Sequence, residues 1–253
     1  MNRIVLESNK LSNYLDDNLS VGDNTIEFFK DGDYILEYIN STLVELEITV
    51  CDNVCVNLFV FSKDVDIKVN EKYQLGKNSE LILKKFYFNR NVLENVAVNL
   101  NGESAKYVSK FSSISKGCED YHLIINHNNH FVSSMISNKC IGIDKSKINI
   151  VIDSVLPKGN IDCVMDQTTR IINMGEVEAA IVPNMFIDDD SAYARHGSVI
   201  SEFSMDDVFY LMSRGVSYEE AILLLIKGFI FSNIDVDMEK RGKIFSCLQE
   251  LGR

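Results

Sequence analysis

Short stretches of alternating apolar and polar residues follow one another from about residue 26 to about residue 186. Some alternate strictly, as residues 43–50 do, and others are largely apolar, as residues 54–61 are. The first pattern is typical of half-buried strands and the second of buried ones. We therefore predict strands at residues 34–39, 43–50, 54–61, 65–69, 81–88, 96–100, 107–114, 121–125 and 148–152.

The segments between these stretches are short and polar, as at residues 31–33, 101–102 and 158–160. Their residue types favour turns. Because no convincing amphipathic helix interrupts the region, an alternating α/β fold is excluded, whereas a sandwich, a barrel and a parallel β-helix all remain open. With only 2 prolines in 253 residues, the chain slightly favours a stack of many paired strands, since proline cannot donate to a central ladder. We find no exact short repeat, so a solenoid would be an irregular one.

After residue 203 the apolar spacing becomes that of helices. Ser204 is a candidate N-cap with a carboxylate three residues later, and Gly215 is a candidate end of that helix. Ser217 and Glu220 form a second capping box, and a third helix is expected at about residues 236–251. The chain should thus have a β-rich core domain at residues 1–203, with residues 1–25 as an irregular lead-in, and a helical region at residues 204–253.

The charge balance excludes some partners. The chain has 25 Lys and Arg against 37 Asp and Glu, a net charge of −12. This negative charge argues against sequence-independent binding of nucleic acid and against docking on an anionic membrane. The first seven residues break their apolar run with charge, no stretch has the length of a membrane span, and the six cysteines are scattered. We therefore expect a cytoplasmic protein with reduced thiols.

Several blocks of the second half carry a family resemblance. They are residues 121–127, 142–149, Gln167 with 171–175, Pro183 with 188–190, and 194–198. The most specific block, residues 206–216, reads Asp-Asp-Val-Phe-Tyr-Leu-Met-Ser-Arg-Gly-Val. In this order the blocks resemble the SufB/SufD family, the β-helical scaffold subunits of a machinery that assembles iron–sulfur clusters.

The resemblance implies a right-handed parallel β-helix whose C-terminal helices dock a SufC-like ABC ATPase. Members pair through their β-helices, so a homodimer or a heterodimer with a SufB-like paralogue is expected, with a transient iron–sulfur cluster near the pairing surface. No nucleotide-binding loop is visible in this chain, so ATP hydrolysis would come from the partner and the chain itself would not be an enzyme. The long N-terminal helical region of larger members has no counterpart here.

His196 is the leading site candidate. In SufD-like members the matching histidine lies at the subunit interface, where it is proposed to bind iron or the cluster, and imidazole is a competent iron ligand. The alternative is a histidine hydrogen-bonded at a strand end. SufB-like members carry a glutamate and a cysteine where this chain has Gly197 and about Thr169, and some SufD-like members have a cysteine where it has Ala194. These departures favour a SufD-like protein.

Cys163, six residues before Thr169, is a second candidate for cluster binding; its alternative is a buried cysteine that acts as a small hydrophobe.

His122, His127 and His130 lie close together in sequence, but the odd spacing of the first two sends them to opposite faces of a strand, which favours structural hydrogen bonds over a metal site. Residues 188–190 are three aspartates without the pattern of a calcium loop, which suits a solvated acidic turn or a surface for recruiting iron.

The helical region carries the expected partner surface. Its apolar side chains suit burial on the β-body or in a partner groove, or both on opposite faces. The candidate partner-binding residues are Tyr210, Leu211, Arg214, Ile222, Leu225 and Phe229. Two other functions stay open: a purely architectural SufD-like partner with the ligands on another chain, and a β-helical carbohydrate-active enzyme, which the missing tryptophan and the helical tail disfavour.

Overall fold

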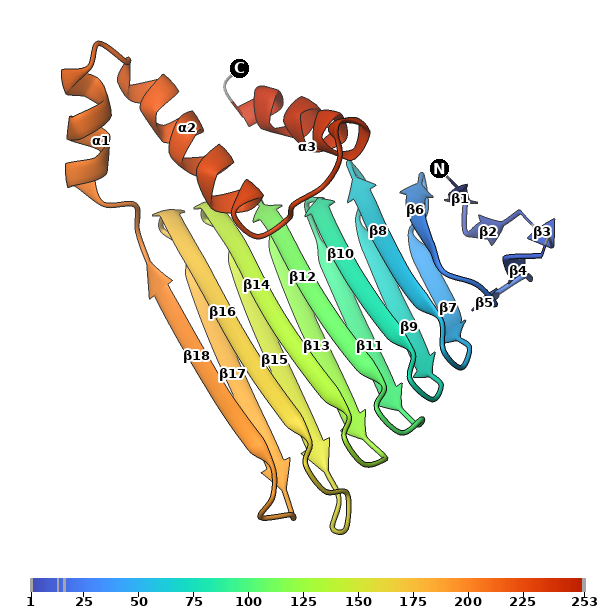
Figure 1. Ribbon diagram of the computed structural model, residues 1–253. Helices are drawn as coiled ribbons and strands as arrows, with labels where there is room; N and C mark the ends of the chain where they lie inside the picture. Colours follow the sequence, from blue (N-terminus) through green and yellow to red (C-terminus); the bar gives the residue numbers. More distant parts are fainter. Residues whose placement is uncertain (1, 13, 16, 252–253) are drawn as a thin grey trace.

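The computed structural model describes residues 2–12, 14–15 and 17–251, over which the chain forms a parallel β-solenoid of about six turns followed by three helices (Figure 1). Two sheets face each other. Sheet A contains, in spatial order, β18 (Tyr193–Ser201), β16 (Val164–Gly175), β14 (Ser133–Asp144), β12 (Lys106–Ser115), β10 (Glu80–Phe88), β8 (Cys55–Lys63), β6 (Gly32–Ile39), β1 (Asn2–Glu7) and β2 (Lys10–Leu11). Sheet B contains β17 (Glu178–Ile187), β15 (Lys147–Leu156), β13 (Cys118–His127), β11 (Val92–Leu100), β9 (Ile67–Leu75), β7 (Leu43–Val50), β5 (Thr25–Phe28), β4 (Leu19–Val21) and β3 (Tyr14–Leu15).

From β5 to β18 the chain passes from one sheet to the other with each strand, so that neighbours within a sheet are parallel and belong to successive coils. The coils lengthen along the chain. Glu80 lies opposite Cys55, 25 residues earlier, whereas Val164 lies opposite Ser133, 31 residues earlier. The parallel solenoid expected from the resemblance is confirmed, and the changing coil length explains why the sequence shows no exact repeat.

The lumen between the sheets is filled by the inward-facing residue of each alternating pair. Aliphatic side chains form most of it, and they stack in columns because the coils are in register, as Val50, Leu75 and Leu100 do. Four tyrosines are also fully buried there: Tyr34, Tyr73, Tyr87 and Tyr107. The alternation in the sequence is therefore the alternation between lumen and outer face.

One charged cluster lies inside the lumen. The ammonium of Lys85 pairs with the carboxylates of Glu71 and Glu94, and the Lys85 Nζ to Glu94 Oε1 distance is 3.2 Å. Tyr38 and Tyr73 donate hydrogen bonds to Glu71. Burial alone would lower the pKa of Lys85, but the two carboxylates outweigh it and raise this pKa above its ordinary value. Lys85 is thus the cation that makes two buried carboxylates tolerable.

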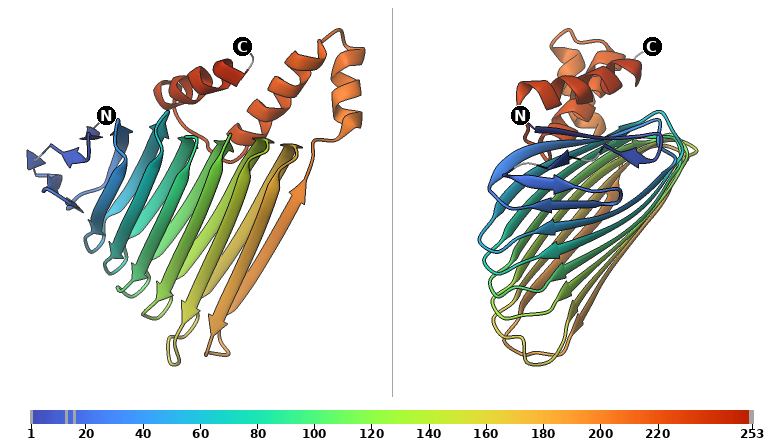
Figure 2. Two further views of the ribbon diagram at one scale, coloured as in Figure 1. Left: turned by 180° about the vertical axis from the view of Figure 1, so that it is seen from behind. Right: turned by 90° about the vertical axis from the view of Figure 1, so that its right-hand side faces the viewer.

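The N-terminal end of the solenoid is covered by short strands. β1 pairs parallel with β6 and antiparallel with β2, while β3, β4 and β5 form an antiparallel meander on sheet B (Figure 2). The sequence predicts an irregular lead-in at residues 1–25, whereas the described residues of this segment contain the strands β1 to β4 and the start of β5. Two of them are only two residues long, which is too short to show a period of two in the sequence.

The three helices are α1 (Met205–Ser213), α2 (Tyr218–Phe231) and α3 (Met238–Leu251). The N-cap of α1 is Ser204, whose side chain accepts the N–H of Asp206 at 3.2 Å. At α2 the expected capping box is present, with Ser217 and Glu220 bonded to each other's backbone N–H. α1 and α2 therefore each begin at a residue whose side chain accepts from backbone donors that the first turn leaves unpaired.

α2 and α3 lie over sheet A near the carboxyl ends of its strands (Figures 1 and 2). Outward-facing apolar residues of the sheet meet the apolar faces of the two helices in one buried cluster, which includes Ile35, Phe59, Phe86, Ile114, Ile141, Ile172, Ile226, Phe229, Ile230, Ile244 and Leu248. Both faces of sheet A are therefore buried at this end, which explains the largely apolar sequence of strands such as β8.

The C-terminus of α2 meets cations of sheet A. The last turn, residues 228–231, is Gly-Phe-Ile-Phe. Lys139 Nζ donates to Ser232 Oγ at 2.6 Å, and Lys139 and Arg170 lie 5.3 and 5.6 Å from the centre of the Phe229 ring. Positive charge at a helix C-terminus is favourable, so the sheet supplies the charge that the helix itself does not place there.

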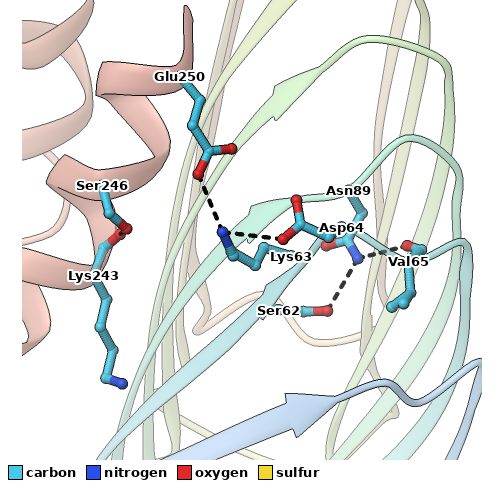
Figure 3. Close-up of polar contacts among 8 residues, drawn as sticks. All are labelled: Ser62, Lys63, Asp64, Val65, Asn89, Lys243, Ser246 and Glu250. Carbon is cyan, nitrogen blue, oxygen red and sulfur yellow. Dashed lines mark hydrogen bonds and ion pairs between the residues drawn. The ribbon is translucent and has the colours of Figure 1, made fainter.

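α3 is also joined to sheet A by ion pairs. Lys63, at the end of β8, lies 3.2 Å from Glu250 of α3 and 3.0 Å from Asp64 (Figure 3). In the adjoining turn Asn89 Nδ2 donates to Ser62 Oγ and to the Val65 carbonyl, at 3.1 and 2.7 Å.

Two turns earlier along α3, Lys243 pairs with the buried carboxylate of Glu37 on β6, which also receives Arg3 from β1. Ion pairs thereby join α3 to sheet A at Glu250 and at Lys243.

Candidate functional site

The C-terminal end of the solenoid is open. β18 pairs with β16 and β17 pairs with β15, and within the described part of the chain neither strand has a partner on its other side. Large apolar side chains are exposed on these two strands: Val182, Phe186, Ile187, Tyr193, Val199 and Ile200. An uncovered strand edge with apolar neighbours is a surface that other chains can extend.

His196 lies at the mouth of this open end. It is in the middle of β18, where it stands opposite Gln167 of β16. Ala194 packs against the lumen core, so by alternation His196 faces the lumen side as well. Its side chain is exposed, and among the described residues no side chain forms a hydrogen bond with its imidazole. His196 is therefore neither at a strand end nor held by a structural bond.

The other positions compared with family members in the sequence lie near His196. Ala194 precedes it by two residues on β18, and Gly197 follows it directly. Thr169 faces the lumen on β16, opposite Ser198, and accepts a hydrogen bond from Asn138 Nδ2 at 3.1 Å. The structure brings these positions together, and it places no thiol or carboxylate at any of them.

Cys163 lies away from His196. It is buried in the turn before β16, where its Sγ contacts the carbonyl oxygens of Asn129 and Asn160 at 3.4 and 3.6 Å. Burial raises the pKa of its thiol. Because it precedes Gln167 by four residues, it is about 13 Å along the strand from the row of His196. The structure thus does not bring the two candidate ligands together, and the surroundings of Cys163 match those of a small buried hydrophobe.

The other histidines make structural contacts, as expected. His127 is buried in the lumen with Nε2 2.9 Å from Ser134 Oγ and Nδ1 3.1 Å from the Val155 carbonyl, and burial lowers its pKa to about 4. His122 lies on the outer face of sheet B, 2.7 Å from Asp153. The expected opposite faces are confirmed.

His130 Nδ1 accepts the N–H of Ile161 at 3.3 Å. In the aspartate turn, Asp189 accepts from Ser191 and from the Gly159 N–H, which makes it part of the turn. Among the residues that the structure describes, no group of three or more His, Cys, Asp and Glu side chains is arranged to hold a metal.

The candidate partner-binding residues divide between two faces. Tyr210 is 60% exposed on α1, with the Arg214 guanidinium 5.3 Å from its ring centre. Leu211, Ile222 and Leu225 are half-buried. Phe229 is buried against sheet A. α1 also exposes other large apolar side chains: Met205, Phe209 and Met212. One face of the helical region therefore covers the sheet, and α1 presents the other.

Sequence reasoning missed the exposed apolar residues of β17 and β18 and the Lys85 cluster. Apolar residues of an end strand look the same in sequence as those of an interior strand, so the first group carries no distinguishing signal. The second has one: Lys84 and Lys85 are adjacent in a strand, so one of the two must point into the lumen.

The comparisons with known proteins agree with this geometry. The family model "SUF system FeS cluster assembly, SufBD core domain" matches residues 45–229. An iron–sulfur cluster assembly SufBD family protein of Pyrococcus horikoshii is 25% identical over 170 residues, 64% of this chain and 34% of the relative. Others are those of Staphylococcus saprophyticus, 35% identical over 104 residues (39% and 21%), and Mycobacterium leprae, 38% identical over 79 residues (30% and 20%).

The matched segments thus span about a third or less of the length of these curated relatives. None of the helices that the structure describes has the length and apolar character of a bilayer-spanning segment. The residues matched by the family model include most of the solenoid, all of α1 and most of α2. The chain belongs to the SufBD family of iron–sulfur cluster assembly proteins.

Proposed function

We propose that this chain is a non-catalytic scaffold subunit of a SUF-type complex, which pairs through the open end of its solenoid and docks a SufC-like ABC ATPase through its helical region. The observation that supports it best is the open end itself, with His196 at its mouth. The iron or the nascent cluster is cargo in this proposal, held for a time between two chains and then passed on.

The open end suits pairing because each of the two sheets ends there in a strand with an unpaired edge. β17 and β18 each leave a row of backbone N–H and C=O groups without a strand partner in the described part of the chain, and six large apolar side chains surround them. A second solenoid end of the same kind would satisfy both sets of groups. The partner is a second copy of this chain or a SufB-like paralogue.

His196 would be one ligand among several. Iron in sulfur clusters is usually held by four ligands, of which imidazole can be one. Since His196 has no cysteine or carboxylate beside it at Ala194, Gly197 and Thr169, the remaining protein ligands would come from the partner chain. In our proposal, the lack of a cysteine or carboxylate at these three positions is the feature that makes the chain SufD-like.

Pairing can be tested by placing charge on the open edge. We expect the double variant Val199→Lys/Ile200→Lys to dissociate the homodimer or the heterodimer, since both residues are half-exposed apolar side chains of β18. Size exclusion with light scattering, on the chain alone and with its SufB-like paralogue, measures this. Met135→Lys is the control, because Met135 is 50% exposed on β14 but away from the edge. Unchanged mass of the double variant would rule out pairing at β18.

Docking of the ATPase can be tested on α1. Phe209 and Tyr210 are 58% and 60% exposed, and exposed aromatic residues are frequent binding hot spots. We expect Phe209→Ala/Tyr210→Ala to weaken binding of the SufC-like ATPase about 30-fold or more, as measured by calorimetry. Met238→Ala serves as the control, because Met238 is 81% exposed on α3. Binding of the double variant at wild-type strength would remove α1 from the docking surface.

The ligand role of His196 has its own test. We expect His196→Ala to lower the iron and sulfide retained by the assembled complex after anaerobic reconstitution, while the chain still folds, because the side chain of His196 is exposed. His122→Ala is the control, because His122 is a half-buried histidine on the outer face of sheet B, away from the open end. Undiminished retention in His196→Ala would mean that the ligands are on other chains and that this subunit is purely architectural.

A further inference from the structure

Gln167 is the lumen residue directly beneath His196, and its side-chain amide is held in one orientation. Nε2 donates to Ser154 Oγ at 2.8 Å and, more weakly, toward the Asn184 carbonyl at 3.4 Å. A backbone carbonyl can only accept, so the group that faces Asn184 must be the NH₂ and not the oxygen. The orientation of the amide fixes where Oε1 points.

Oε1 of Gln167 is buried and, among the described residues, has no hydrogen-bond partner. A buried acceptor left in this state costs free energy, so a donor for it is expected nearby. Its register neighbours on the lumen side are Ile136 on β14 and His196 on β18. Ile136 has no polar atom, whereas the imidazole of His196 has an N–H and is free to rotate at the exposed end.

We propose that Gln167 is a positioning residue for His196: its Oε1 accepts the N–H of one imidazole nitrogen and thereby leaves the other nitrogen unprotonated and directed out of the solenoid mouth. Register neighbours in a sheet lie about 4.8 Å apart, within reach of two side chains of this length. Because Oε1 can only accept, it selects one tautomer. The network Ser154–Gln167–His196 then ties an exposed ligand to the rigid lumen.

The functional meaning of this inference rests on the proposed function, since a free imidazole nitrogen matters only if it meets iron. A second hydrogen bond that fixes the ring of a metal-binding histidine usually affects metal affinity by about 10–100-fold. The pairing of Gln167 with His196 itself can be observed without any metal.

The experiment is nitrogen-15 NMR of the histidine side chains in the full chain, with the His196 signal assigned by its loss in His196→Ala. We expect a single tautomer of neutral His196 in the wild type and a mixture in Gln167→Met, which has a similar shape but no acceptor. Gln167→Glu should raise the measured pKa of His196 by about one unit or more, because a carboxylate replaces the amide. Thr169→Val, another lumen residue of β16, should change neither property.

The remaining outcomes distinguish a failure of the Gln167–His196 inference from a failure of the proposed function. A single tautomer that persists in Gln167→Met, together with an unshifted His196 in Gln167→Glu, would overturn the inference. If Gln167→Met does not fold, Gln167→Glu decides alone, since it has almost the same shape. In the assembled complex we expect Gln167→Met to weaken binding of ferrous iron about 10–100-fold. Altered tautomers with unaltered iron binding would support the Gln167–His196 bond and contradict the ligand role of His196.

Discussion

Replacing Lys85 by methionine is expected to lower the free energy of unfolding by about 3–5 kcal/mol, because the variant leaves two buried carboxylates without their cation. Glu71 and Glu94 are inside the lumen, where water cannot compensate the loss. Burial already raises the pKa of Glu94 against the opposing effect of Lys85, so its ionised form is tolerated only with the ammonium present. Urea unfolding at neutral pH measures the change.

Two controls define the origin of this effect. Lys68→Met removes an exposed lysine from the outer face of sheet B and should change stability by less than about 0.5 kcal/mol. The triple variant Lys85→Met/Glu71→Gln/Glu94→Gln removes the buried charges together and should recover most of the loss. A triple variant as unstable as Lys85→Met would show that the damage comes from packing and not from unpaired charge.

Gly102→Ala is expected to destabilise the chain by about 3 kcal/mol, because the added methyl group would meet the backbone of the neighbouring coil. Gly102 lies in the turn between β11 and β12, and a Cβ there would clash with backbone atoms of Gly76 and Lys77 in the turn below. Backbone cannot rotate away as a side chain can. Thermal and urea unfolding measure the effect.

Gly228→Ala is the matched control. It lies in α2 with open space around its missing side chain, and alanine favours a helix over glycine, so this variant should gain about 0.5–1 kcal/mol. Equal stability of the Gly102→Ala variant and the wild type would mean that the turns of successive coils separate easily.

The local structure of the solenoid could be read from the sequence, but its coiling could not. Alternation predicted strands such as β7 and β11, because it reports which side chains face the lumen. It does not report which strands pair, and coils of 22 to 31 residues leave no fixed period that would show it. Only the resemblance of residues 206–216 and the earlier blocks separated a β-helix from a sandwich or a barrel.

The candidate site, like the fold, could be predicted from the sequence only in part. His196 was found through its neighbours in the motif, and the structure places it at the open end. Cys163 is close in sequence to Thr169, yet it lies in the turn before β16, about 13 Å along the strand from the row of His196. Exposure of β17 and β18 was not predictable, because their alternating residues look like those of any inner coil and only the end of the stack leaves them uncovered.

The two ends of the solenoid differ, and this difference limits how chains can associate. At the N-terminal end the described sheets finish in β2 and β3, which are only two residues long and therefore offer little edge for another chain. A stack with two open ends could grow into a fibre by adding units head to tail, whereas units with one open end can only meet face to face. Association through β17 and β18 would therefore stop at two chains and place the two histidine-bearing mouths against each other about a single axis.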